Sequence, residues 1–91
     1  FEDQLLAEAI ANYMVVNGCA STISGNRIFT FSEIAYHFHI TEERLAELRE
    51  EVESNLADYP QVMDGDGIWI EDDAFNLTFD GNYCDVNYER A

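Results

Sequence analysis

Apolar residues recur every three to four positions through the first two thirds of the chain, which is the period of an amphipathic helix. The pattern predicts a first helix over residues 2–17, a short second helix over residues 31–38 and a longer third helix over residues 41–58. Asn17-Gly18 is expected to end the first helix, and one short strand is expected at residues 27–29. The positions expected to face inward from the first helix are Leu5, Leu6, Ala9, Ile10, Tyr13, Met14 and Val16.

Two threonines mark the starts of the second and third helices. Thr30 is followed three residues later by Glu33, which forms a capping box. Thr41 is a second N-cap, followed by acids that suit the positive end of a helix dipole. Tyr59-Pro60 should stop the third helix, because the residue before a proline avoids the helical conformation. The inward positions are Ile34, Ala35 and Phe38 in the second helix and Leu45, Leu48, Val52 and Leu56 in the third.

Beyond the proline the hydrophobic period changes to two residues, which is typical of a β-strand. Residues 61–63 and 68–70 flank Asp64-Gly65-Asp66-Gly67, and the Asp-Gly chemistry predicts a β-hairpin that turns at residues 64–67. A third strand is predicted over residues 74–79 and a last strand over residues 83–88.

Together these elements predict one α+β domain that spans all 91 residues. Three helices should precede a C-terminal β-hairpin or small antiparallel sheet. A chain of this size buries about two thirds of its unfolded surface, which is enough for a single core. The residues expected to meet in that core are Ile10, Ile34, Leu45, Leu48 and Val52.

The order helix, short strand, helix, tight turn, helix and two-stranded wing resembles a winged helix-turn-helix domain. The resemblance is carried by residues 31–48, where an Ile34-Ala35 pair in the second helix is followed by apolar Ile40 in the turn. A third helix capped by Thr41, with spaced leucines, completes the pattern. The resemblance implies a winged-helix-like fold with its wing at residues 61–70.

The charge of the chain contradicts the DNA-binding role that this fold has in many regulators. The sequence has nineteen acids, four basic residues and a net charge of −15, and none of the basic residues is lysine. In a winged helix the third helix enters the major groove, and its contact residues are basic or amide side chains. Carboxylates on the third helix of this chain, and at Asp64 and Asp66, would repel DNA phosphates and anionic membranes alike. The outward side chains of the third helix are Glu42, Glu43, Glu47, Glu50, Glu51 and Glu53, against Arg44 and Arg49.

The charge pattern instead indicates a protein that presents carboxylates where a nucleic acid would lie. Glutamates recur about once per turn of the third helix, roughly 5–6 Å along its axis. In size and acidity the chain is similar to virus-encoded inhibitors of host restriction, repair and CRISPR systems. That similarity implies a DNA or RNA mimic that binds a basic nucleic-acid-binding protein in the host cytoplasm. The expected partner-binding residues are Glu43, Glu47, Glu50, Glu51, Asp64, Asp66 and Trp69, of which Trp69 is either an interface anchor or a core residue.

Two other interpretations remain open. One is a winged-helix adaptor or regulator that acts through protein contacts, with the acidity serving solubility and steering. Its binding should survive high salt, which shortens the Debye length to about 3 Å at 1 M. The other is salt adaptation, in which every protein surface of the source is acidic. The absence of lysine fits it, but the many Asn, Phe and Tyr residues do not.

Candidate catalytic and metal-binding motifs are weak. Asp64-Gly65-Asp66-Gly67 fails as an EF-hand loop, because Phe75 stands where the twelfth-position glutamate is required. His37 and His39 lie two residues apart on a helix and cannot ligate one ion together. No nucleophile signature or phosphate-binding glycine loop is present, so we expect neither an enzyme nor a cofactor. Cys19 and Cys84 could form one bridge in a secreted protein, but we expect two free thiols in a reducing cytoplasm.

Overall fold

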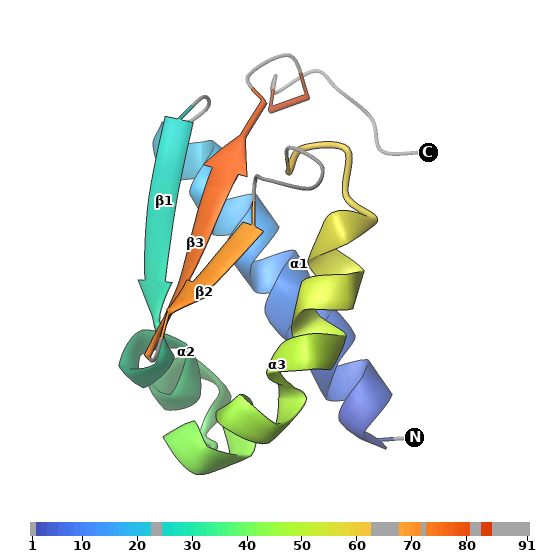
Figure 1. Ribbon diagram of the computed structural model, residues 1–91, viewed down its shortest axis with the longest axis vertical. Coiled ribbons are helices and arrows are strands. Elements are labelled where there is room, and N and C mark those ends of the chain that lie inside the picture. Colours follow the sequence, from blue (N-terminus) through green and yellow to red (C-terminus); the bar gives the residue numbers. More distant parts are fainter. Residues whose placement is uncertain (1, 23–24, 63–67, 72, 81–82, 85–91) are drawn as a thin grey trace.

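The computed structural model describes residues 2–22, 25–62, 68–71, 73–80 and 83–84. The fold class is α+β, as predicted, with three helices and a small antiparallel sheet (Figure 1). No helix in these ranges is long and apolar enough to cross a lipid bilayer. The elements, in chain order, are α1 (Glu2–Thr22), β1 (Gly25–Thr30), α2 (Phe31–Phe38), α3 (Glu42–Ala57), β2 (Ile68–Glu71) and β3 (Ala74–Phe79).

The predicted caps of α2 and α3 are confirmed. The hydroxyl of Thr30 accepts a hydrogen bond from the backbone N–H of Glu33 at 3.1 Å, and the hydroxyl of Thr41 accepts one from Arg44 at 3.0 Å. His39 ends α2 in the left-handed conformation, with φ of 57°. The third helix ends at Ala57, just before the proline, so both helices occupy the predicted ranges to within one residue.

The first helix is longer than predicted. It runs through Gly18 to Thr22 rather than ending at residue 17. The reason lies in tertiary packing: the ring of Phe79 fills the space that a Cβ atom at Gly18 would occupy. Gly18 therefore serves close approach between α1 and β3, and the prediction that it ends the helix is wrong.

The predicted inward face of α1 is correct only in part. Ile10 and Met14 are fully buried, but the side chains of Leu5 and Val16 are 55% and 57% exposed. Apolar residues lie on every side of this helix, so periodicity alone does not select the buried side. The buried positions are Ala7, Ile10, Ala11, Met14, Val15 and Gly18.

The sheet has the strand order β1-β3-β2, with both pairings antiparallel. Its hairpin joins β2 to β3, because Glu71 pairs with Ala74 across residues 72 and 73. The predicted pairing of residues 61–63 with 68–70 is not found among the described residues: β2 pairs with β3 instead, and Val62 forms an isolated bridge to Phe79. The six-residue β3 is a longer partner for β2 than the short 61–63 segment.

The third predicted strand is confirmed as β3. The expected turn at residues 64–67 lies outside the described residues. So does most of the expected strand at residues 83–88, of which the described residues 83–84 are not in a strand.

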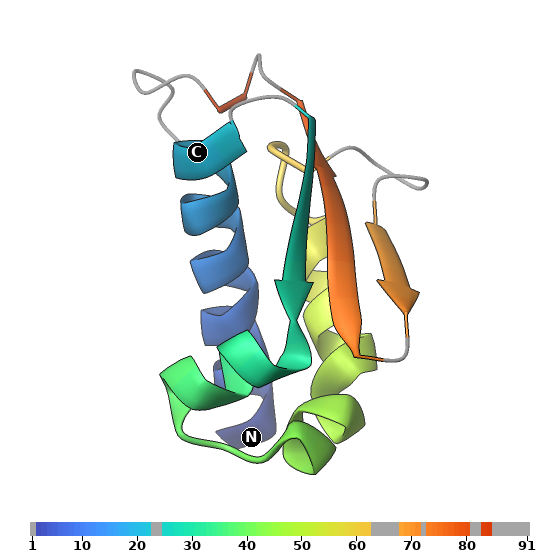
Figure 2. The same cartoon turned by 90° about the vertical axis from the view of Figure 1, so that its left-hand side faces the viewer.

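One face of the sheet packs on the neighbouring helices α1 and α3, and α2 lies at one end of the molecule (Figures 1 and 2). The five residues predicted to form the core all belong to one buried cluster, as expected. The largest fully buried side chains are Phe29, Phe75 and Phe79 of the sheet, with Ile10, Met14, Ile34, Leu45, Leu48, Leu56 and Leu77.

Cys19 and Cys84 form a disulfide bond, with their Cα atoms 5.2 Å apart. This differs from the expectation of two free thiols. Because Phe79 packs against Gly18, the residues that follow β3 return to the C-terminal end of α1 and bring the two cysteines together. The bridge joins positions 65 residues apart in the sequence.

Candidate partner-binding surface

The buried stripe of α3 determines which of its side chains reach solvent. Leu45, Leu48, Val52 and Leu56 are between 0% and 2% exposed and hold one side of the helix against the core. The opposite side is therefore turned outward. The predicted contact residues on α3 are all exposed and share this outward side: Glu43, Glu47, Glu50 and Glu51.

Some of the acidic residues of α3 have a local structural explanation and others do not. Glu42 and Glu43 lie in the first turn, where the positive end of the helix dipole stabilises them. Glu47, Glu50 and Glu51 lie farther along, where this effect has faded. Like charges three or four residues apart on a helix each cost about 0.2–0.5 kcal/mol. The ion pair between Arg44 and Glu47 offsets part of that cost. We call the set Glu43, Glu47, Glu50 and Glu51 the α3 acidic face.

Two arginines in the described part of the chain are held by carboxylates. Arg44 bonds to Asp3 of α1 and lies 3.8 Å from Glu47. The hydrogen bond to Asp3, together with the charge of that carboxylate, raises the pKa of Arg44 above its ordinary value. This pair fastens the start of α3 to the start of α1.

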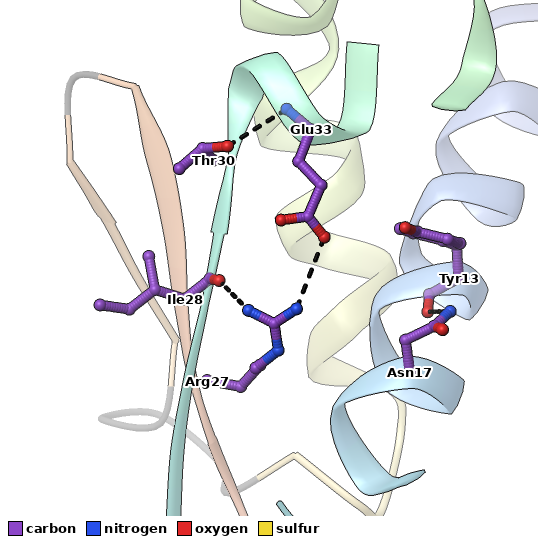
Figure 3. Close-up of polar contacts among 6 residues, drawn as sticks. All are labelled: Tyr13, Asn17, Arg27, Ile28, Thr30 and Glu33. Carbon is purple, nitrogen blue, oxygen red and sulfur yellow. Dashed lines mark hydrogen bonds and ion pairs between the residues drawn. The ribbon is translucent and has the colours of Figure 1, made fainter. Parts of the chain in front are cut away.

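Arg27 of β1 is held in a similar way at the other side of the fold (Figure 3). Its guanidinium lies 3.5 Å from Glu33 and donates to the carbonyl of Ile28 at 2.5 Å. It also lies 4.3 Å from the ring centroid of Phe29. Arg27 and Arg44 are thus engaged internally, which weakens any positive field that a nucleic acid would encounter.

The acidic surface extends from α3 onto α1. A groove of about 280 Å³ between these helices is lined by Glu8 and Gln4 on one side and by Glu51, Ser54 and Asn55 on the other. Glu8 was not among the predicted contact residues. Gln4 and Glu8 are one helical turn apart, but only the packing of α1 on α3 shows that this side of α1 borders the acidic face.

The remaining predicted contact residues are not brought to the α3 acidic face by the described structure. Asp64 and Asp66 lie outside the described residues. The hairpin that the structure describes joins β2 to β3 farther along the chain, and Asp73 lies in its turn. Asp73 in that turn is exposed, and its carbonyl accepts a hydrogen bond from Phe31 at 2.7 Å. This turn therefore carries an exposed carboxylate.

Trp69 belongs to β2, where it is registered opposite Asn76 of β3. Its neighbours Ile68 and Ile70 are registered opposite the buried residues Leu77 and Phe75. The side chain of Trp69 lies outside what the structure describes. Trp69 therefore alternates with the two β2 positions that lie opposite buried residues of β3.

Both histidines lie near the end of α2. The ring of His37 stacks on Tyr13 of α1 with centroids 4.2 Å apart, and His39 caps the helix. Among the described residues, no three His, Cys, Asp or Glu side chains gather closely enough to hold a metal ion.

Comparison of this chain with protein-family models, with curated proteins and with solved structures finds no match.

Proposed function

We propose that this chain is a non-enzymatic inhibitor that binds a nucleic-acid-binding protein by imitating the charge of DNA or RNA. The observation that carries the proposal is the α3 acidic face. It lies on the exposed side of the helix that, in a winged-helix domain, enters the major groove. Repulsion among its mid-helix glutamates is only partly offset by Arg44, and a basic partner would relieve the remainder.

The mechanism is competition for a phosphate-binding groove. A basic groove that normally neutralises phosphates meets carboxylates about once per helical turn. Complementary charge speeds the encounter, and partial desolvation strengthens the ion pairs once the surfaces meet. Glu8 and Glu51 widen the surface across the α1–α3 groove. The partner is a basic restriction, repair or CRISPR protein or complex of the host, without direct contact between this chain and nucleic acid.

The test is capture from a host lysate on the immobilised chain, followed by elution with duplex DNA or single-stranded RNA. We expect the captured proteins to bind nucleic acid and to be released by it. The double variant Glu47→Arg/Glu50→Arg should lose them, while Glu2→Arg, at the start of α1, should keep them. Both variants should fold, because exposed charges contribute little to stability.

Three results would contradict the proposal. These are that the captured proteins do not bind nucleic acid, that the nucleic-acid eluent does not release them, and that they still bind the double variant. A fourth check uses the purified chain alone with a plain DNA duplex at low salt, where we expect no gel shift because of phosphate repulsion.

The proposed targets place the chain in the host cytoplasm. Disulfide bonds are rare in that reducing compartment and common outside it. The bridge between Cys19 and Cys84 therefore makes a direct test available. Thiol alkylation at the moment of cell lysis, followed by mass spectrometry, reports whether the two cysteines are reduced or joined in the cell.

A second candidate function is an adaptor that binds a protein partner through apolar contacts. It is favoured by Leu5 and Val16 of α1, which are more than half exposed, and by Tyr36 of α2, which is 85% exposed. Binding by these residues should persist at 1 M salt, whereas binding through the α3 acidic face should weaken strongly.

A further inference from the structure

A second concave surface lies at the opposite end of α3 from its N-cap. It has a volume of about 380 Å³. Its walls come from the end of α3 and the residues just after it, and from Asp80 and Tyr83, which follow β3. Two tyrosines, Tyr59 and Tyr83, and two carboxylates, Asp58 and Asp80, line it, with Pro60 and Val62 among the apolar residues.

We infer that this concavity is a binding site for the guanidinium group of an arginine side chain from a partner protein. Tyrosine rings attract cations through their faces, and a planar guanidinium can stack on a ring while its N–H groups fork toward carboxylates. The apolar residues suit the alkyl stem of the arginine. A neutral side chain could donate hydrogen bonds to Asp58 and Asp80 but would lack the attraction between opposite charges.

The helix end adds a further attraction for a cation. The last turn of α3 contains no basic residue. The C-terminal end of a helix carries partial negative charge, and Asp58 at the C-cap adds a full one instead of offsetting it. This is an unfavourable arrangement for the helix alone, and a bound cation would relieve it.

Contacts with neighbouring parts of the chain hold residues on both walls of the site. The Tyr59 hydroxyl donates to Asn12 of α1 at 3.3 Å, which holds its ring. On the other wall, Asp80 N–H bonds to Gln61 at 2.9 Å and Tyr83 N–H bonds to Asp80 at 3.0 Å. The next residue, Cys84, is bridged to α1. A preformed site lowers the entropic cost of binding.

The inference depends on the proposed function only for the identity of the protein that carries the arginine. The site itself is tested without that protein. The probe is N-acetyl-arginine amide, added to the isotope-labelled, oxidised chain and followed by amide chemical shifts. The matched control ligand is N-acetyl-citrulline amide, which has nearly the same shape and no charge.

We expect saturable shifts at the amides of Asp58, Tyr59 and Tyr83, and at least tenfold weaker binding of the citrulline compound. Tyr83→Leu should weaken arginine binding about 2- to 5-fold, as expected for one partly exposed cation–π contact. Tyr36→Leu, which removes an exposed tyrosine elsewhere, should leave it unchanged. Asp58→Asn should weaken binding more than Glu53→Gln, which removes an exposed carboxylate from α3 outside the concavity.

The inference is overturned if no shifts occur, if citrulline binds as well as arginine, or if the shifts centre on the α3 acidic face and are unaffected by Tyr83→Leu. Arginine binding at this site together with unchanged capture by Glu47→Arg/Glu50→Arg would remove the proposed function alone. No arginine binding at this site, together with loss of capture by Glu47→Arg/Glu50→Arg, would overturn this inference and leave the proposed function standing.

Discussion

The substitution Gly18→Ala tests why α1 continues past the position where its sequence suggests an end. Alanine improves helix propensity over glycine by about 1 kcal/mol. Against this, the new methyl group would overlap the ring of Phe79, which is only 1% exposed and lies at the end of a paired strand. Overpacking of a core costs about 1–3 kcal/mol. Because several ring atoms meet the methyl group, we take the upper half of that range and expect a net loss of about 1–2 kcal/mol.

A second substitution separates packing from a backbone effect. Phe79→Leu removes the ring atoms that the methyl group would meet, and alone it should cost about 1–2 kcal/mol, less than truncation to alanine. In the double variant Gly18→Ala/Phe79→Leu the methyl group finds room. The two losses should then fail to add, with a coupling energy of about 1–2 kcal/mol.

The assay is urea unfolding of the oxidised chain, followed by far-UV circular dichroism, for all four members of the cycle. Additive losses, within about 0.5 kcal/mol, would refute the packing account. So would a gain in stability for Gly18→Ala alone.

Three further predictions concern stability and use the same unfolding assay. Leu48→Ala, at a position 2% exposed, should cost about 2–5 kcal/mol, whereas Leu5→Ala, at a position 55% exposed, should cost well under 1 kcal/mol; equal losses would mean that the buried stripe of α3 is assigned wrongly. Thr41→Ala removes the cap of α3 and should cost about 1 kcal/mol, and no loss would show that the hydrogen bond to Arg44 is unimportant. Cys19→Ser/Cys84→Ser opens a loop of 65 residues and should cost about 4 kcal/mol in the chain-entropy treatment; an unchanged urea midpoint would show that the purified wild-type chain lacks the bridge.

The sequence predicted α2 and α3 well because their boundaries depend on local chemistry. Thr30 and Thr41 satisfy backbone N–H groups within three residues of themselves, and Pro60 cannot continue a helix. The exposed position of the α3 acidic face followed from the same helix, since a single apolar stripe leaves one outward side.

The errors came from features that depend on distant contacts. The role of Gly18 is set by Phe79, a residue far along the chain. The Asp-Gly pairs between Val62 and Ile68 resemble hairpin turns, yet the hairpin forms farther on, around residues 72 and 73. The concavity at the end of α3 had no signal in the sequence, because Tyr59 and Tyr83 share it only after β3 has joined the sheet.

The central position of β3 has a consequence for how the chain is made. Neither β1 nor β2 pairs with the other; each pairs only with β3, the last of the three to leave the ribosome. Until residue 79 has emerged, a growing chain can form helices but no sheet, and Phe29 has no strand partner to cover it. Ribosome-bound intermediates should therefore resemble a loose helical bundle with exposed aromatic side chains. A chain truncated by a stop codon before Ala74 should fail to form a smaller version of the fold and should be degraded by proteases.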